Sequence, residues 1–229
     1  MLSDKLIVVF PGQGSQVVGM GLDIFKKHHV ARHVFDEVDD TLNFKLSKII
    51  FEGPEDQLTF TPNTQPALMA VSLAIVRVIE HETKKKIYEI ADVLLGHSLG
   101  EYSALCSLNV FTLRDATNLL RVRGEAMQNS VKGLKTKMSA VIGLDLDKIE
   151  NILENTKLLN DDVCEIANDN CPGQVILSGT QNGVDMISEL VKENGARTVI
   201  DLKVSAPFHC KLMKNASLII DEKLRNINF

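Results

Sequence analysis

The chain has 229 residues, of which 30 are acidic and 25 are Lys or Arg, so its formal net charge at pH 7 is −5. Hydrophobic residues make up 45% and charged residues 24%, which are ordinary globular proportions that exclude a disordered tail, a collagen-like repeat and a small disulfide-stapled scaffold. The mild acidic excess argues against nucleic-acid binding, which normally uses a basic face.

The cysteines show neither C-x-x-C nor zinc-finger spacing, so reduced thiols and no metal site are expected. The longest apolar stretch, residues 67–79, is interrupted by Ser72 and Arg77 and is shorter than the ~20 residues of a membrane span. The N-terminus lacks the basic start and long apolar region of a secretory signal. These features predict a cytoplasmic protein without a membrane partner.

Short apolar runs at residues 6–10 and 92–96 each end in a glycine-containing turn, which is typical of buried parallel strands. Between them, residues 65–80 carry apolar side chains at helical spacing, and Pro66 suits the first turn of that helix. Strands that alternate with helices predict a parallel sheet covered on both faces.

The pattern changes after residue 137. We expect strands, helices and turns in the order β-α-β-β-α-β, which is the split unit of ferredoxin-like folds. The predicted segments are residues 138–143, 147–155, 164–167, 174–178, 182–194 and 197–202, with a turn rich in Asn, Asp, Pro and Gly between the two middle strands. This unit is interpreted as an insert in a larger α/β domain.

Ser98 is the strongest candidate for a catalytic residue. It is the serine of a G-x-S-x-G motif at residues 96–100, which follows an apolar strand and precedes a helix. That context is what a nucleophile elbow requires, and the backbone N–H of Leu99 is the natural donor to a developing oxyanion.

A nucleophilic serine needs a base, and the chain has six histidines. His97 neighbours the serine in sequence but should point away from it, so we expect it at the mouth of the pocket. His209 follows the last predicted strand in a proline-containing loop, where catalytic groups often lie, and is favoured over a structural histidine.

Two further segments offer polar groups. The loop at residues 11–16 is rich in glycine but lacks the Lys-Ser/Thr of a phosphate-binding loop, so Gln13 is interpreted as a second arm of an oxyanion hole. Arg121 and Arg123 should face different ways on one helix, and either could be a solvated surface residue or a buried carboxylate ligand.

Five motifs together resemble the malonyl-CoA:acyl carrier protein transacylase family. They occur in order from residue 10 to residue 210, at residues 10–16, 96–101, 123–128, 170–174 and 205–210. The resemblance implies an α/β-hydrolase-like parallel-sheet core, residues 1–132 and 203–229, with a ferredoxin-like subdomain at residues 133–202. It also implies malonyl transfer from malonyl-CoA to the phosphopantetheine thiol of acyl carrier protein, without a metal or redox cofactor, by a chain expected to be monomeric.

The same resemblance implies a role for each candidate. Ser98 would carry the malonyl ester, His209 would act as base and then acid, and Arg123 would hold the free carboxylate of malonate. The remaining implied roles are oxyanion binding by the amides of Gln13 and Leu99, and substrate contacts by Met127, Asn170 and Phe208, with His97 beside them.

Family members usually continue beyond the histidine with a glutamine whose carbonyl orients it, whereas this sequence ends at Phe229. We therefore expect weakened activity and some uncovered apolar surface. Two other functions remain open from the sequence. A serine esterase or thioesterase would share the elbow and release acid to water, and an inactive fragment would bind carrier protein without becoming acylated.

Overall fold

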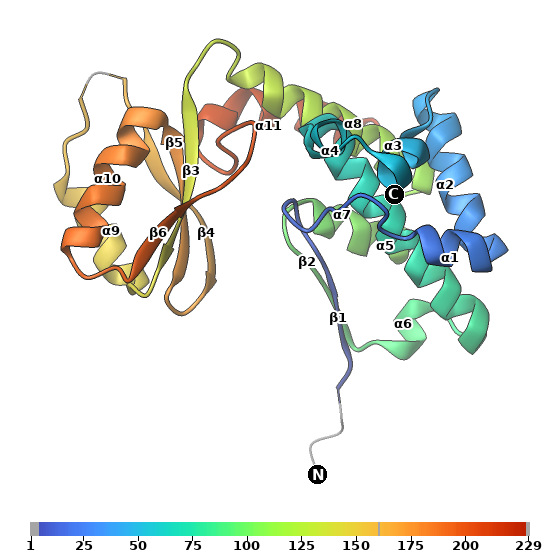
Figure 1. The fold of residues 1–229 in the computed structure, drawn as a ribbon. Helices are drawn as coiled ribbons and strands as arrows, with labels where there is room; N and C mark the ends of the chain where they lie inside the picture. Colours follow the sequence, from blue (N-terminus) through green and yellow to red (C-terminus); the bar gives the residue numbers. More distant parts are fainter. Residues whose placement is uncertain (1–4, 160, 228–229) are drawn as a thin grey trace. The chain divides into compact units, whose positions relative to one another are not determined.

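The computed structural model describes residues 5–159 and 161–227, which form two compact units. The helical unit contains the described residues of 1–125 and of 222–229, and the sheet unit contains those of 126–221. The boundaries fall within two helices rather than in loops. Figure 1 shows the helices and strands of both units, coloured along the sequence.

The helices of the model are α1 (Leu22–Lys27), α2 (His29–Leu42), α3 (Leu46–Glu52), α4 (Glu55–Thr59), α5 (Thr61–Thr83), α6 (Ile87–Ile90), α7 (Leu99–Ser107), α8 (Leu113–Ser130), α9 (Leu146–Asn155), α10 (Gln181–Glu193) and α11 (Lys214–Arg225), with a 3₁₀ turn η1 (Lys211–Met213). The strands are β1 (Ile7–Phe10), β2 (Val93–Gly96), β3 (Thr136–Ile142), β4 (Cys164–Cys171), β5 (Gln174–Thr180) and β6 (Thr198–Asp201).

The helical unit is built around α5. Its core contains apolar side chains of α2, α3, α5, α7 and α8, among them Phe35, Leu73 and Leu120. The sequence places the start of this helix too late, because α5 begins at Thr61 and not at residue 65. Pro62 therefore occupies the first turn, and Pro66 lies inside the helix.

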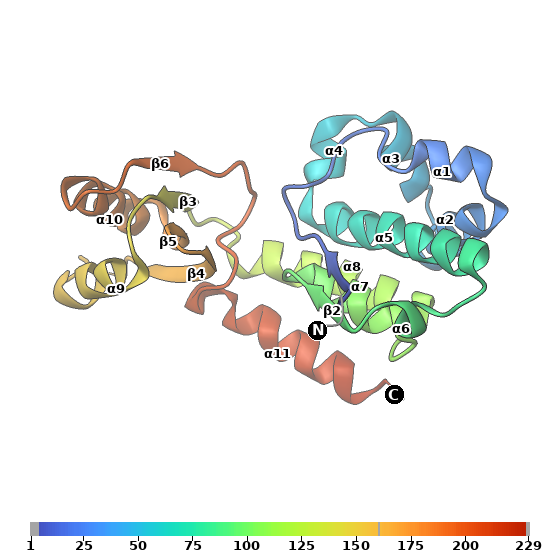
Figure 2. The same cartoon turned by 90° about the horizontal axis from the view of Figure 1, so that it is seen from below.

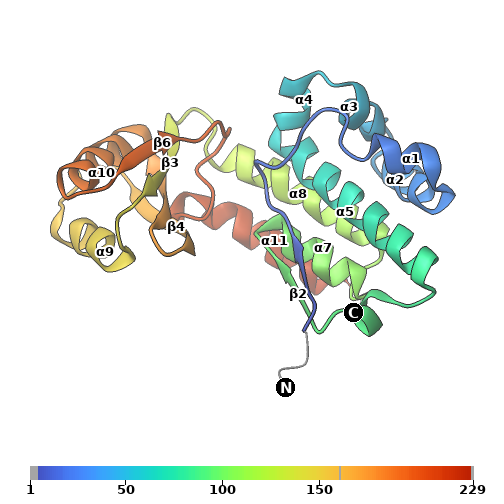
Figure 3. The same ribbon diagram turned by 60° about the horizontal axis from the view of Figure 1, so that its bottom comes forward.

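The parallel sheet of the helical unit has two strands in the described chain, β1 and β2, which lie side by side in front of α7 (Figure 3). Side chains alternate between the two faces of a strand. Phe10 packs on one face against Val76, Ile87 and Ala104. On the opposite face Val9 is 65%, Ile7 52% and Leu95 51% exposed. The prediction of cover on both faces is therefore wrong for this sheet, whereas the expected uncovered apolar surface is present.

The sheet unit follows the predicted order of strands and helices. Its four strands have the spatial order β4-β5-β3-β6, and every neighbouring pair is antiparallel. Helices α9 and α10 lie together on one face of this sheet (Figure 2), where Ile149, Val184 and Ile187 are fully buried. A second buried cluster contains apolar residues of β3, the end of α8 and the start of α11. The fold is thus mixed α/β.

Strand β4 is longer than the sequence suggests. It extends to Cys171 because irregular pairing with β5, with register shifts between Ile166 and Asn168 and between Asp169 and Cys171, accommodates polar residues. Asn170 therefore lies at the end of a strand and not in the turn predicted for it.

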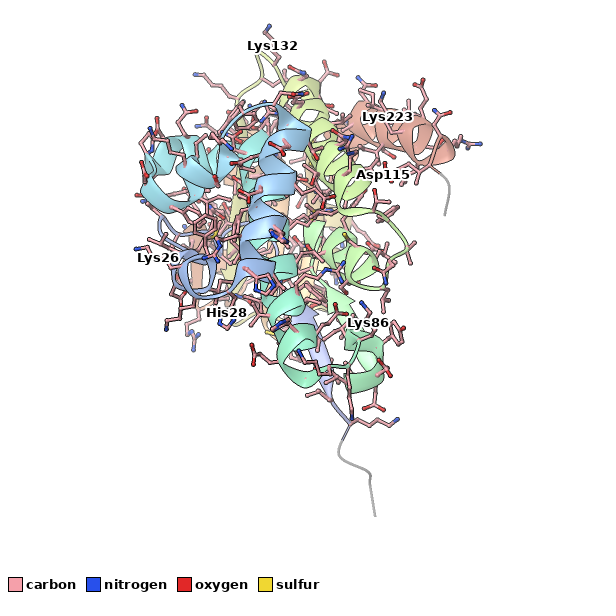
Figure 4. The ribbon with its side chains drawn as sticks, turned by 90° about the vertical axis from the view of Figure 1, so that its right-hand side faces the viewer. Lys26, His28, Lys86, Asp115, Lys132 and Lys223 are labelled. Carbon is pink, nitrogen blue, oxygen red and sulfur yellow. The ribbon has the colours of Figure 1, made fainter. Side chains whose placement is uncertain are left out.

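Charged side chains cover the outside of the helical unit, and those of Lys26 and Lys86 project from it (Figure 4). The imidazole Nδ1 of His28 lies 3.7 Å from a carboxylate oxygen of Glu82 at the end of α5. Across residues 5–159 and 161–227, no helix is long and apolar enough to cross a membrane, and no group of His, Cys, Asp and Glu could hold a metal ion.

Candidate active site

Ser98 lies in a tight turn between β2 and α7. Its backbone has φ 53 and ψ −109, a conformation that is strained for any residue other than glycine. The glycines on either side allow the turn to close. A Cβ at Gly96 would lie 2.1 Å from the amide nitrogen of Glu101, and a Cβ at Gly100 would lie 2.3 Å from the carbonyl oxygen of Phe10. The strand, turn and helix predicted around Ser98 are therefore present.

Arg123 reaches Ser98 from α8. Its Nη2 donates a hydrogen bond of 3.0 Å to the Oγ of Ser98, and its Nη1 donates one of 2.8 Å to the Oε1 of Gln65 on α5. Within the described ranges, no carboxylate lies at ion-pairing distance from this guanidinium. The positive charge beside the serine hydroxyl is thus held by neutral groups.

Arg121 has different partners, although it lies only two residues earlier on the same helix. Its Nε is 2.6 Å from a carboxylate oxygen of Glu125, and its Nη1 donates a 2.7 Å hydrogen bond to Asn63. The sequence leaves open which of the two arginines is the candidate carboxylate ligand, and the structure distinguishes them by their partners. Arg121 is neutralised by an acid, and Arg123 faces the serine.

An aromatic ring packs beside Arg123. The guanidinium carbon lies 5.6 Å from the ring centroid of Tyr102, which stacks in turn on Phe111. Burial lowers the pKa of Arg123, and the nearby groups of Tyr102 and Glu101 partly oppose this change. Burial also raises the pKa of Tyr102, while the charge of Arg123 acts in the opposite direction. Arg123 remains a cation at physiological pH, because a guanidinium is not deprotonated in proteins.

The two amides expected to bind an oxyanion both belong to the helical unit. Leu99 is the first residue of α7, and the next two amides, of Gly100 and Glu101, donate to the carbonyl oxygens of His97 and Ser98. Gln13 follows β1, and its side-chain Nε2 donates a 3.2 Å hydrogen bond to the Oγ1 of the buried Thr61. The bond fixes the side chain of Gln13.

His209 belongs to the sheet unit, in the loop between β6 and η1. It is exposed and has φ 57, which is uncommon for a histidine. The loop around it is held in place on both sides. The amide of Phe208 donates to the Sδ of Met138 at 3.2 Å, and the amide of Lys211 donates to the carboxylate of Glu165 at 2.8 Å.

The other predicted substrate-binding residues occupy different environments. Met127 and Phe208 belong to one buried cluster of the sheet unit, so the structure brings these two together. Asn170 is exposed at the end of β4, also in the sheet unit. His97 is exposed in the helical unit, and its backbone amide donates to the carbonyl of Phe10.

Comparison with known proteins identifies the family. Residues 7–228 match the acyl transferase domain family. The Malonyl CoA-acyl carrier protein transacylase of Bacillus subtilis (strain 168) is 42% identical over 223 residues, which are 97% of this chain and 67% of that protein. The chain belongs to the malonyl-CoA:acyl carrier protein transacylase family. The transacylase of Haemophilus influenzae is 40% identical, and the match covers 97% of this chain and 70% of that protein.

Solved transacylases have the same fold. The acyl-carrier-protein-S-malonyltransferase of Bartonella henselae superposes with a TM-score of 0.91 at 46% identity, over 97% of this chain and 70% of that one. A malonyl-transacylase in complex with a type II PKS acyl-carrier protein gives 0.91 at 37% identity, over 98% of this chain and 71% of that one. The chain therefore spans roughly two thirds to seven tenths of the length of these transacylases.

Sequence reasoning missed Gln65 and Tyr102, the two residues beside Arg123. Gln65 is only 1% exposed, yet it is a polar residue at the start of a largely apolar helix. Such a buried amide normally has a specific partner, and this was the signal available in the sequence.

Proposed function

We propose that this transacylase-family chain transfers a malonyl group from malonyl-CoA to the phosphopantetheine thiol of acyl carrier protein, through a malonyl ester on Ser98. The observation that carries this proposal is the hydrogen bond from Arg123, which has no acid partner in the described residues, to the Ser98 hydroxyl. A cation held by neutral groups next to a nucleophile is suited to an acyl group that ends in a carboxylate.

In the first step the Oγ of Ser98 attacks the thioester carbonyl and loses its proton to the imidazole of His209. The amides of Gln13 and Leu99 stabilise the oxyanion of the tetrahedral intermediate. The intermediate collapses when the carbon–sulfur bond breaks, and the imidazolium returns the proton to the thiolate of coenzyme A. In the second step the carrier-protein thiol attacks the ester and the same groups act in reverse.

The remaining predicted contacts refine selectivity in this proposal. Arg123 binds the malonyl carboxylate in a bidentate manner. Phe208 and Met127 shape the pocket so that an α-methyl group is excluded, while Asn170 and His97 border it. The partner is acyl carrier protein, and its presence in the solved complex of a related malonyl-transacylase supports this assignment.

The domain organisation is also part of the proposal. An α/β-hydrolase-like core, residues 1–132 and 203–229, carries a ferredoxin-like insert at residues 133–202. Support comes from the parallel pairing of β1 with β2 and from the strand order β4-β5-β3-β6. Strands in this order, with α9 and α10 as the two crossovers, form the split β-α-β unit twice.

Intact-mass measurement after mixing with malonyl-CoA tests the function. We expect one malonyl adduct on the unchanged chain, none on Ser98→Ala, and loss of the adduct when holo acyl carrier protein is added. An adduct that persists in Ser98→Ala would contradict the role of the serine. An adduct that is released to water at the same rate without carrier protein would identify a thioesterase.

A further inference from the structure

Arg121 and Arg123 of α8 are held by opposite kinds of partner. Arg121 is paired with the carboxylate of Glu125, at 2.6 Å, on the outside of the helical unit. Arg123 donates to the amide oxygen of Gln65 at 2.8 Å. The acceptor at Gln65 is as well placed as a carboxylate would be, but it carries no charge. The fold therefore orients this guanidinium without neutralising it.

The position of Gln65 is fixed by the close approach of two helices. Gly124 lies against the start of α5, where an added Cβ would be 2.6 Å from the Cα of Pro62. Because no side chain separates α8 from α5 at this point, the guanidinium of Arg123 can reach an amide one turn into α5. Gln65 is itself almost completely buried, at 1% exposure, so its side chain has little freedom to move away.

We propose that Gln65 is a positioning residue that sets acyl-group selectivity, because its neutral amide holds Arg123 toward Ser98 and leaves the charge of the guanidinium available for a substrate carboxylate. This inference rests on the proposed function of the site. A glutamate at this position would have the same length and would provide an internal carboxylate for the same Nη1. The substrate carboxylate would then compete with a permanent partner and would also be repelled by its charge.

The variant Gln65→Glu tests this role directly. We expect its kcat/KM for acylation by malonyl-CoA to fall on the order of 100-fold, since charge-assisted contacts of this kind have about that effect. Acylation by acetyl-CoA, which has no carboxylate, should be unchanged or faster. A purely structural role for Gln65 would lower both rates together, and an unchanged malonyl-to-acetyl ratio would overturn the inference.

Two further variants control the experiment. Glu125→Gln makes the reverse exchange at Arg121, on the exposed side of the same helix, and should leave the malonyl-to-acetyl ratio unchanged. Gln65→Met keeps the size of the side chain but removes the acceptor, so we expect a smaller loss of selectivity, about 10-fold, expressed mainly in KM for malonyl-CoA. A Gln65→Met enzyme with the selectivity of the unchanged chain would show that the amide is not needed.

Binding of free malonate separates this inference from the proposed function. Malonate should raise the Tm of the unchanged chain and of Glu125→Gln, and it should not raise the Tm of Gln65→Glu. If malonate stabilises the unchanged chain but not Gln65→Glu, and no adduct forms, the proposed function fails and only the role of Gln65 in carboxylate binding survives. If the adduct forms and Gln65→Glu retains the malonyl preference, the inference fails alone. No stabilisation of the unchanged chain would also overturn the inference.

Discussion

The helical unit and the sheet unit hold their candidate functional groups in different ways. Ser98 lies in the tight turn before α7 and Arg123 lies in the middle of α8, and their side chains contact each other. His209 is an exposed residue of a loop, and hydrogen bonds from the backbone on either side keep that loop in place. In the proposed mechanism, the residues that would bind a carboxylate therefore belong to one unit, and the proposed base belongs to the other.

Because of this difference, proton transfer and carboxylate binding should be separable by mutation in the proposed reaction. Loss of the proposed base should leave the carboxylate site intact, because the hydrogen bonds of Arg123 to Gln65 and Ser98 both lie within the helical unit. Loss of the arginine should leave the base intact for the same reason. Substitutions in each unit therefore test whether the proposed base and the proposed carboxylate site act independently.

The largest effect is expected in the sheet unit, from His209→Asn. Asparagine tolerates the positive φ of this position, so the loop should keep its conformation. Removal of a general base should slow acylation of Ser98 by about 10²–10⁴-fold, measured by mass spectrometry over time, while malonate still raises the Tm.

The exposed His33 of α2 provides the control, and His33→Asn should acylate at the unchanged rate. If His209→Asn were acylated as fast as the unchanged chain, the base would have to be another group. The assignment of base and carboxylate site to different units would then be wrong.

The next largest effect is expected in the helical unit, from Arg123→Ala. This substitution removes a cation that donates a hydrogen bond to the Oγ of Ser98. We expect the preference for malonyl-CoA over acetyl-CoA to fall about 10- to 100-fold, and Tm to become insensitive to malonate. The matched change Arg121→Ala should reduce stability, because Arg121 contacts Glu125 and Asn63, but should not change the preference. If Arg121→Ala lowered the preference for malonyl-CoA and Arg123→Ala did not, the roles assigned to the two arginines would have to be exchanged.

The turn at Ser98 could be predicted from the sequence because the backbone itself demands it. Only glycine fits at residues 96 and 100, where any Cβ would collide with the chain. The pattern G-x-S-x-G after a strand therefore predicts the tight turn at Ser98. The order of elements in the sheet unit was predictable for a related reason. Short continuous apolar runs mark strands such as β5, and Gly195 follows the end of α10.

The partners of Arg123 could not be predicted, since they depend on how two distant helices approach. Gln65 and Arg123 are 58 residues apart, and their contact requires the close packing of Gly124 on Pro62. Likewise, an apolar pattern in β1 and β2 predicts that both faces favour burial but does not state what covers them. One face of that sheet is exposed, which contradicts the prediction of cover on both faces but agrees with the expected uncovered apolar surface.

A separate prediction concerns the cysteine thiols, which report on each unit independently of the proposed activity. Burial raises the pKa of Cys106, in the helical unit, and of Cys164, in the sheet unit, to about 12. Cys171 is exposed. An aromatic disulfide reagent near pH 8 should therefore react with Cys171 at least about 100-fold faster than with Cys106 or Cys164, because the thiolate is the reactive form.

The variant Cys171→Ser should abolish this fast phase without changing the slow ones. Adding urea should then accelerate the reactions of Cys106 and Cys164, and a difference between their midpoints would show that the two units unfold independently. Rapid reaction of Cys106 without denaturant would mean that the core of the helical unit opens more readily than its packing indicates.

The smallest effect is expected at an ion pair on the surface of the sheet unit. Lys137 lies 2.6 Å from a carboxylate oxygen of Asp185 and 2.8 Å from one of Asp201, which also accepts a hydrogen bond from Ser139. Hydrogen bonding to Lys137 lowers the pKa of Asp201. Since the carboxylate of Asp201 is exposed, Asp201→Asn should reduce the free energy of unfolding by less than about 1 kcal/mol.

The contribution of the Asp201 carboxylate to the free energy of unfolding should depend on pH in a definite direction. A carboxyl group whose pKa is lower in the folded state stabilises the protein above its unfolded pKa, about 3.9, and loses that contribution as the pH falls through the folded pKa. The difference in stability between the unchanged chain and Asp201→Asn should therefore be constant near neutral pH and shrink below about pH 4. Hydrogen exchange of the amides in β3 and β6 measures this difference in stability within the sheet unit.

The control Glu150→Gln, at an exposed position of α9, should show no such difference. A loss above about 2 kcal/mol would mean that this ion pair, and not the apolar clusters beneath α9 and α10, sets the stability of the sheet.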